Sequence, residues 1–217
     1  MRRRMSSSYS RIGPVYDVLS GEYPVYRAGR ELGIAALGLL PGAQVLDLGC
    51  GTGLNFPLLH RAVGPEGLIV GVDRSAGMLR QARRRARRQG WRNVILIEAD
   101  ATTLDTDDIR RSIAGAGGRV LSDAAIATYS LSLMTPWPQA WRRMLQLTAV
   151  GGRLSVVDMQ DPSGPWQVMT PFARVACRLG GADISAHPWQ AVERECTEVT
   201  AASARGAHLQ IRAGRRA

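Results

Sequence analysis

The sequence contains no lysine: its 28 basic residues are all arginine, they outnumber the 18 acidic residues, and the formal net charge is +10. Clustered basic residues supply the non-specific part of binding to nucleic acids and anionic membranes. Complete replacement of lysine by arginine is also what a GC-rich genome produces, so the charge alone does not establish a binding surface. We expect no nucleic-acid partner, whereas a membrane surface stays open as a partner.

Cysteine is scarce and long apolar runs are absent. Cys50, Cys177 and Cys196 are odd in number and widely spaced, without histidines at metal-ligand intervals, which excludes a disulfide framework and a zinc site. We therefore expect no bound metal. No run approaches the roughly 20 apolar residues that would span a bilayer, and no signal peptide is evident. These absences predict a soluble, cytoplasmic protein.

A length of 217 residues favours one domain, 1–217. Residues 1–10 form a polar tail, and 23–40 look helical. Strand-like and helix-like segments then alternate, which predicts a parallel sheet covered on both faces. We expect strands at 44–48, 68–72, 94–98, 124–129 and 153–158. We expect helices between them at 53–62, 76–89, 107–114 and 138–149.

The last part of the chain departs from this alternation. A helix is expected at 168–179, followed by extended segments at 193–200 and 207–213 with no room for a crossover helix between them. We expect these two segments to pair antiparallel at the sheet edge. The helix at 76–89 places methionine, leucine and alanine on one stripe, so its arginines cover a solvent-facing surface.

The stretch "VLDLGCGTGLNF" (45–56) has glycine at 49, 51 and 53, where the first strand gives way to a helix. Glycines there permit a sharp turn and close approach of a ligand to the backbone. A dinucleotide site requires G-x-G-x-x-G, but position 54 is leucine. Asp47 lies beside the loop, where it would repel a pyrophosphate and suit a cation.

Two further carboxylates follow the next strands. Asp73 lies about 20 residues past Gly53, where an acidic residue can accept the hydroxyls of a ribose. Asp100, beside Ala101, is suited to an adenine amino group. A single aspartate at such a position can equally be a helix N-cap. Three of them, together with the glycine loop, predict a site for a cationic nucleoside.

The motifs "VLDLGCGTG", "VGVDRSAGML", "EADAT" and "GGRLSVVD" resemble the class I S-adenosylmethionine-dependent methyltransferase family over about residues 20–160. The resemblance implies an α/β, Rossmann-like three-layer sandwich with a seven-stranded, mostly parallel sheet, an antiparallel last strand and helices on both faces. It also implies the cofactor S-adenosyl-L-methionine and a transferase acting in small-molecule metabolism. Softer similarities point to quinone and lipid-amine methyltransferase branches.

By the family pattern, Asp47 and Gly49, Gly51 and Gly53 hold the methionine part of the cofactor. Asp73 binds the ribose, Asp100 and Ala101 the adenine, and Tyr129 and Ser130 lie under the sulfonium. Arg74 is also taken as cofactor-binding. Residues 1–40 would supply a tail and lid helices, in which Tyr16, Tyr23, Tyr26 and Arg30 cover the cofactor and Arg30 pairs with its carboxylate. These tyrosines can equally be packing residues.

Methyl transfer requires alignment of nucleophile, methyl group and sulfur with exclusion of water. The candidates for catalytic residues are Tyr16, Tyr129 and His187; Asp158 and Asp161 are further candidates for a general base. The covering segment is expected at 160–192. Four aromatic residues in segments expected to cover the carboxyl edge of the sheet, Trp137, Trp166, Phe172 and Trp189, suit a small apolar or aromatic acceptor, although these rings can also serve only to pack.

We therefore expect an S-adenosylmethionine-dependent enzyme that methylates a small, apolar or aromatic metabolite by in-line displacement. Two alternatives stay open: an N-methyltransferase acting on a lipid headgroup at a membrane surface, and a non-catalytic or RNA-directed protein that binds S-adenosylmethionine. The acceptor, the methylated atom and the oligomeric state are not readable from the sequence.

Overall fold

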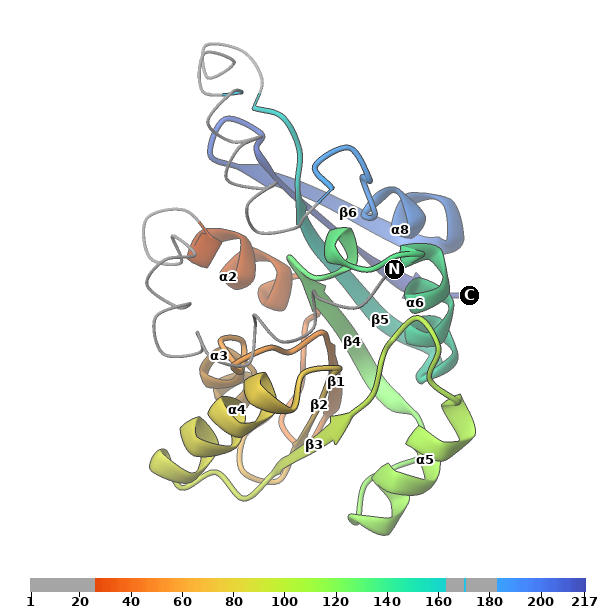
Figure 1. Ribbon diagram of the computed structural model, residues 1–217. Coiled ribbons are helices and arrows are strands. Elements are labelled where there is room, and N and C mark those ends of the chain that lie inside the picture. Colours follow the sequence, from red (N-terminus) through yellow and green to blue (C-terminus); the bar gives the residue numbers. More distant parts are fainter. Residues whose placement is uncertain (1–25, 163–169, 171–182) are drawn as a thin grey trace, which may run out of the picture.

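The computed structural model describes residues 26–162, 170 and 183–217, and they form one seven-stranded sheet with helices on both faces (Figure 1). The strand order is β3-β2-β1-β4-β5-β7-β6. Strands β1 to β5 run parallel, β7 is antiparallel to β5, and β6 is antiparallel to β7. The expected fold class is confirmed. The expected tail at 1–10, Tyr16, Tyr23 and the helix at 168–179 lie outside the described residues.

The strands coincide closely with the expected ones because they are short apolar runs between glycine and acidic residues. Their bounds are β1 Gln44–Leu48, β2 Leu68–Asp73, β3 Val94–Glu98, β4 Ser122–Thr128, β5 Thr148–Met159, β6 Cys196–Ala204 and β7 Leu209–Arg216. Strand β5 begins before the expected residue 153, so that the end of the expected helix at 138–149 is strand.

The helices alternate with the strands along the chain. They are α2 Arg27–Ala35, α3 Phe56–Val63, α4 Ala76–Arg88, α5 Thr106–Gly115, the 3-10 turn η2 Leu131–Leu133, α6 Trp137–Gln146 and α8 Gln190–Glu195. Side-chain caps fix two of the starts: the Ser75 hydroxyl accepts from the N–H of Met78, and Asp105 accepts from the N–H groups of Asp107 and Asp108.

A further boundary was wrong. Residues 193–195 were expected to begin a strand, but they form the second half of α8, and β6 begins at Cys196. The helix buries Ala191 and Val192, and Trp189, just before it, is 3% exposed within the same core. Trp189 therefore packs in the core and does not cover the edge of the sheet, which was the alternative considered for it.

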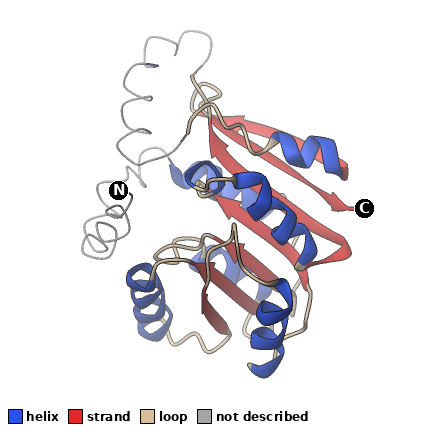
Figure 2. Cartoon of the chain, turned by 45° about the vertical axis from the view of Figure 1, so that its right-hand side comes forward, coloured by secondary structure: helices blue, strands red, loops and turns tan. Residues whose placement is uncertain are grey.

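The helices form two layers (Figures 1 and 2). Helices α5, α6 and α8 cover one face, where Ile113, Trp141 and Met144 pack on β1, β2, β4 and β5. Helices α2, α3 and α4 cover the other, where Phe56 and Leu59 are fully buried. No helix in the described parts of the chain is long and apolar enough to cross a membrane.

Candidate active site

The carboxyl ends of β1, β2 and β3 lie side by side. Asp47 in β1 is in register with Gly71 in β2, and Asp73 at the end of β2 is in register with Glu98 in β3, two residues before Asp100. The fold therefore brings the three expected carboxylates to one edge of the sheet, the edge at which open α/β sheets bind ligands.

All three glycines of the loop after β1 have left-handed backbone, with φ of +75° at Gly49, +55° at Gly51 and +77° at Gly53. A Cβ at Gly49 would lie 2.5 Å from the Cβ of Ser130, and a Cβ at Gly53 would lie 2.6 Å from the Phe56 ring. A Cβ at Gly51 would meet nothing within 4 Å among the described residues. Gly49 and Gly53 thus serve close packing, whereas Gly51 faces open space into which a ligand can approach the backbone.

Asp47 is completely buried beside this loop. Its Oδ1 accepts a 2.9 Å hydrogen bond from Nδ2 of Asn55, while its Oδ2 has no hydrogen-bond partner among the residues that the structure describes. Burial raises the pKa of Asp47 to about 7, although the Asn55 hydrogen bond and the charge of Arg30 lower it in part. An unpartnered buried carboxylate oxygen is costly unless a donor or a cation is supplied to it.

Asn55 and Thr128 belong to the site and were not anticipated. Nη1 of Arg30 donates to Oδ1 of Asn55 at 3.0 Å and to Oγ1 of Thr128 at 2.8 Å, and Nδ2 of Asn55 also donates to Thr128 at 3.0 Å. The Arg30 guanidinium lies 5.2 Å from the centre of the Tyr129 ring. This network joins α2, the loop before α3 and the end of β4. The only sequence signal was a polar residue between Leu54 and Phe56, at the start of an apolar helix.

Asp73, at the end of β2, also stabilises the glycine loop by hydrogen bonding. Its Oδ2 accepts from the N–H of Gly51 at 2.9 Å and its Oδ1 from the N–H of Ser75 at 2.8 Å. Burial raises the pKa of Asp73, although these two bonds and the charge of Arg74 lower it in part. Each oxygen keeps acceptor capacity beyond these bonds, because a carboxylate oxygen accepts about two.

Asp100 is half-buried and accepts from both the backbone N–H and the hydroxyl of Thr102, at 2.9 and 2.7 Å. Burial raises the pKa of Asp100, but the Thr102 hydrogen bonds and the charge of Arg74 outweigh this and leave it below its usual value. Arg74 is exposed and acts electrostatically on both Asp73 and Asp100. Ala101 is 5% exposed.

Tyr129 and Ser130 follow β4 at the same edge. Oγ of Ser130 donates to the carbonyl of Leu48 at 2.9 Å, which ties this turn to β1. Tyr129 has a φ of +53°, and its hydroxyl donates to the Tyr26 carbonyl at 2.8 Å. A non-glycine residue in this region is strained, and such strain is often found at functional sites.

Of the remaining candidates for catalytic residues, the structure describes His187, Asp158 and Asp161. His187 also has positive φ, +46°, and its ring lies 4.7 Å from that of Trp189. Asp158 is buried and accepts from the hydroxyl and N–H of Ser132 and from the N–H of Met159; burial raises its pKa to about 6. Asp158 thus fixes η2. Asp161 is half-buried, and Tyr16, Trp166 and Phe172 lie outside the described residues.

The cysteine within the loop is not suited to nucleophilic chemistry. Burial, with the charges of Asp47 and Asp73, raises the pKa of the Cys50 thiol well above its usual value, so it stays protonated. No cluster of three histidine, cysteine or acidic side chains that could hold a metal occurs in residues 26–162 and 183–217.

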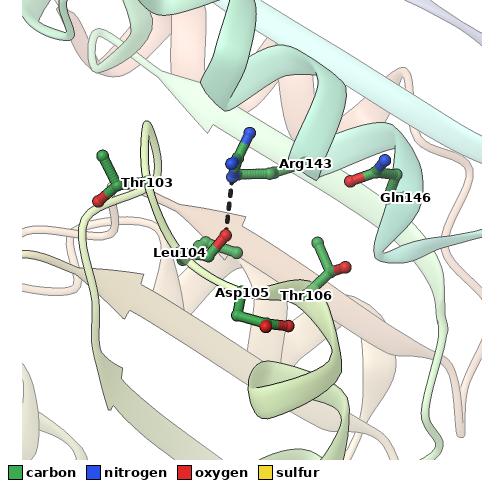
Figure 3. A pocket seen from close by; sticks show the side chains of 6 residues that line it. All are labelled: Thr103, Leu104, Asp105, Thr106, Arg143 and Gln146. Carbon is green, nitrogen blue, oxygen red and sulfur yellow. Dashed lines mark hydrogen bonds between the residues drawn. The ribbon is translucent and has the colours of Figure 1, made fainter.

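A concavity away from these carboxylates lies between α5 and α6 (Figure 3). It is an open hollow of about 370 Å³ lined by Thr103, Leu104, Asp105, Thr106, Arg143 and Gln146. Nε of Arg143 donates to the Leu104 carbonyl across it at 2.8 Å. None of the strand-end carboxylates lines this hollow, and we assign it no ligand.

Comparison with known proteins identifies the family. The family described as "Methyltransferase domain" matches residues 39–204. The 2-phytyl-1,4-naphtoquinone methyltransferase of Nostoc punctiforme is 29% identical over 168 residues, covering 76% of this chain and 68% of that protein. The ubiquinone/menaquinone biosynthesis C-methyltransferase of Hahella chejuensis is 28% identical over 166 residues, covering 72% and 62%.

A solved structure of a methyltransferase shares this fold. A crystal structure of a SAM dependent methyltransferase from Aquifex aeolicus superposes with a TM-score of 0.60 at 14% identity, covering 99% of this chain and all of that one. The family match spans the glycine loop, the three carboxylates and the turn after β4. The chain belongs to the methyltransferase domain family and is an S-adenosylmethionine-dependent methyltransferase.

Proposed function

We propose that the strand-end edge binds S-adenosylmethionine through the residues described above and transfers its methyl group to a ring carbon of a quinone-type aromatic acceptor. When bound, the cofactor supplies a methyl group on a positively charged sulfur. The observation that carries the cofactor part is Oδ2 of buried Asp47, which has no hydrogen-bond partner among the described residues and lies beside the loop in which Gly51 has an open side. The amino group of a methionine moiety would supply a donor to Oδ2 of Asp47, and the moiety would approach the main chain on the open side of Gly51.

The other residues complete the proposed cofactor site. Asp73 has acceptor capacity left for ribose hydroxyls, and Asp100 and the buried Ala101 offer an acceptor and an apolar surface for adenine. We assign Tyr129 and Ser130, in the turn after β4 at the same edge, to the part of the site that would face the sulfur of the cofactor. Arg30 is engaged with Asn55, Thr128 and the Tyr129 ring. We assign it to hold the methionine end of the site in shape and to face the cofactor carboxylate.

The relatives support the acceptor class, because one is named a 2-phytyl-1,4-naphtoquinone methyltransferase and another a C-methyltransferase of ubiquinone/menaquinone biosynthesis. Methylation of a ring carbon requires an electron-rich ring, so the reduced, dihydroxy form of the acceptor is the reacting species. A group that accepts the phenolic proton would help. Tyr129, His187 and Tyr16 are our candidates, and of these the structure describes Tyr129 and His187.

A labelling assay tests the acceptor. Protein, S-adenosylmethionine with a labelled methyl group and a reduced naphthoquinone lacking the ring methyl should yield a labelled product with the methyl on carbon. Phosphatidylethanolamine, incubated in parallel, should stay unlabelled. Label in the lipid amine and none in the quinol would replace the proposed acceptor with a headgroup nitrogen.

A binding assay tests the cofactor site independently. Asp73→Ala should weaken S-adenosylmethionine binding by roughly 100-fold, because it removes a charged acceptor for two hydroxyls and frees the Gly51 N–H. Asp107→Asn, a change at an exposed carboxylate on α5, should leave binding unchanged. Calorimetric affinities of both variants, with thermal unfolding as the check on folding, decide the assignment; equal affinity in Asp73→Ala rejects it.

A further inference from the structure

Helix α4 carries a line of arginines on its solvent side. Five of its 13 residues are exposed arginines, and they follow one another at intervals of three, one, three and one residues, which keeps them on one side of a helix. The opposite side, with Met78, Leu79, Ala82 and Ala86, is buried. We name the line of Arg80, Arg83, Arg84, Arg87 and Arg88 the α4 stripe.

The α4 stripe is not neutralised. Helix α4 contains no acidic residue, and none of the five arginines forms an ion pair within the described parts of the chain. Arginines three or four residues apart repel each other, so the stripe destabilises its own helix. Such an arrangement calls for a counter-charge from outside the molecule.

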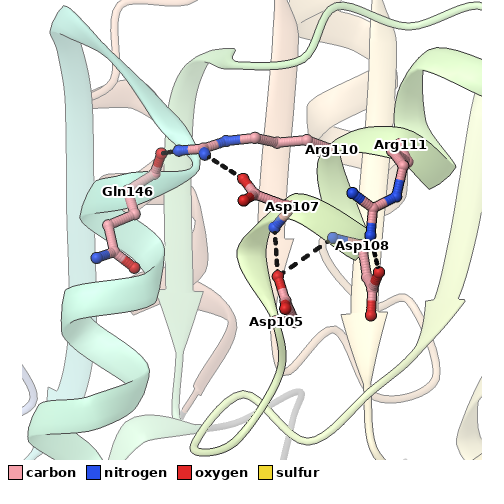
Figure 4. Close-up of polar contacts among 6 residues, drawn as sticks. All are labelled: Asp105, Asp107, Asp108, Arg110, Arg111 and Gln146. Atoms are coloured by element: carbon pink, nitrogen blue, oxygen red, sulfur yellow. Dashed lines mark hydrogen bonds and ion pairs between the residues drawn. The ribbon is translucent and has the colours of Figure 1, made fainter.

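Helix α5 shows that base composition does not account for this pattern. Arg110 and Arg111 are also adjacent arginines on an outer helix, but each pairs with an aspartate three residues earlier, Asp107 and Asp108 (Figure 4). Both helices belong to the same lysine-free, arginine-rich sequence. The difference lies in the acidic residues, which are present on α5 and absent from α4.

The stripe favours a flat anionic surface over a nucleic acid. It extends about 12 Å along a straight helix, and α4 contains no aromatic residue on which a base could stack. An apolar quinone-type acceptor would reside in lipid, so the choice of a membrane rests in part on the proposed function. Ser75, which caps α4, lies two residues after Asp73, so one end of the stripe is at the edge that holds the site.

We propose that the α4 stripe docks this enzyme on anionic lipid bilayers. The binding is electrostatic, because no large apolar side chain accompanies the arginines on that face. Helix α4 lies along the bilayer surface, and its N-terminal end brings the strand-end site near the lipid boundary from which the acceptor enters.

Vesicle co-sedimentation tests the proposal without the acceptor. The protein should bind vesicles of phosphatidylglycerol and phosphatidylcholine at low salt, release in about 0.5 M salt and ignore vesicles of phosphatidylcholine alone. The triple variant Arg83→Gln, Arg84→Gln, Arg87→Gln should lose roughly 100-fold in partitioning. Removal of three charges elsewhere, Arg142→Gln, Arg194→Gln, Arg205→Gln, at exposed positions off α4, should change it far less.

The outcomes separate this inference from the proposed function. Equal loss in both triple variants, or binding of the unaltered protein to neutral vesicles, overturns the docking surface. Salt-sensitive RNA binding that depends on Arg83, Arg84 and Arg87, without vesicle binding, replaces the membrane by nucleic acid. Because the α4 triple variant should methylate a short-tailed, water-soluble quinol normally, failure of the unaltered protein on that quinol counts against the proposed function alone.

Discussion

At the residue scale, Asp47 contributes to the pH dependence of stability, as do the other buried carboxyl groups with a raised pKa, Asp73 and Asp158. The pKa of Asp47 is raised from 3.8 to about 7 because its charge is buried. Between these two values the folded state keeps a proton that the unfolded state has released, so the contribution of Asp47 to stability is fully present below about pH 4 and is lost as the pH rises through 7. The full difference is about 4 kcal/mol.

Asp47→Asn removes this titration. We expect the variant to be more stable than the unaltered protein at pH 8, by up to about 4 kcal/mol, and similar to it near pH 4. Urea unfolding at the two pH values measures this. The variant should also lose S-adenosylmethionine binding, which would show that the buried charge is kept for the ligand. A variant less stable at pH 8 would refute the destabilising role of the ionised side chain.

Asn55 provides a second prediction at this scale. Asn55→Ala removes the hydrogen bond to Asp47 and an acceptor of Arg30, so we expect a loss of about 1–3 kcal/mol in stability and about tenfold in cofactor affinity. Asn93→Ala is the matched control, because Asn93 bonds the carbonyls of Gly64 and Gly67 away from the site. Asn93→Ala should lower the stability by a similar amount and leave the cofactor affinity, measured by calorimetry, unchanged. Equal losses of cofactor affinity in the two variants would show that Asn55 has only a structural role.

Asn55 and Thr128 also mark the limit of prediction from sequence. Their hydrogen bond spans 73 positions, and the bond from Arg30 to Thr128 spans 98. Asp47, Asp73 and Asp100 were foreseeable because each lies at or near the end of a recognisable strand. Asn55 was not, because a buried polar residue is identified by its partners, and those come from other elements.

At the element scale, the glycine loop separates packing from binding. Gly51→Ala meets no described neighbour, so it should cost about 1 kcal/mol for its left-handed φ. Because the new methyl would occupy the open side of the loop, cofactor affinity should fall by tenfold or more. Gly90→Ala has the same open surroundings and a φ of +70° at the end of α4, and it should cost stability alone. Calorimetry and thermal unfolding of the pair measure both effects; unchanged affinity in Gly51→Ala would place the ligand elsewhere.

Helix α4 yields a stability prediction of its own. Arg80→Glu should form favourable pairs with Arg83 and Arg84 and raise the unfolding free energy by about 0.5 kcal/mol at low salt. In about 0.5 M salt the gain should shrink, since exposed charges are screened. Urea unfolding at both salt levels measures it, and a gain that persists in high salt would point to a cause other than charge.

Helix α8 was less predictable than strands of similar length. β1 and β3 lie where expected because their apolar runs end at glycine or acidic residues, whereas α8 has six residues and no full apolar period. Its buried Ala191 and Val192 are adjacent, which fits a strand as well as a helix. Packing against β7 decides in favour of the helix.

At the scale of the whole molecule, the network around Arg30 links the N-terminal side of the described chain to the cofactor loop. We expect S-adenosylmethionine to slow amide exchange in α2 as well as in residues 49–56, because Arg30 bridges the two. Exchange in α5 should not change. Mass spectrometry of the exchanged protein measures this, and in Arg30→Gln the protection of α2 should disappear while that of the loop persists in part. Equal protection of α2 in that variant would exclude the bridge as the link.

The hydrogen bonds that join α5 and the loop before it to α6 determine which substitutions are tolerated at this junction. Arg143 donates to the carbonyl of Leu104, and Arg110 donates to the carbonyl of Gln146, so both acceptors belong to the main chain (Figures 3 and 4). A carbonyl is present whichever side chain the position carries. Substitutions at 104 and 146 therefore leave the acceptors in place, whereas 110 and 143 must keep a long side chain with an N–H donor to retain these bonds. At this junction, hydrogen bonding constrains the side chains of the two donor positions, 110 and 143. It places no constraint on the side chains of the two acceptor positions, 104 and 146.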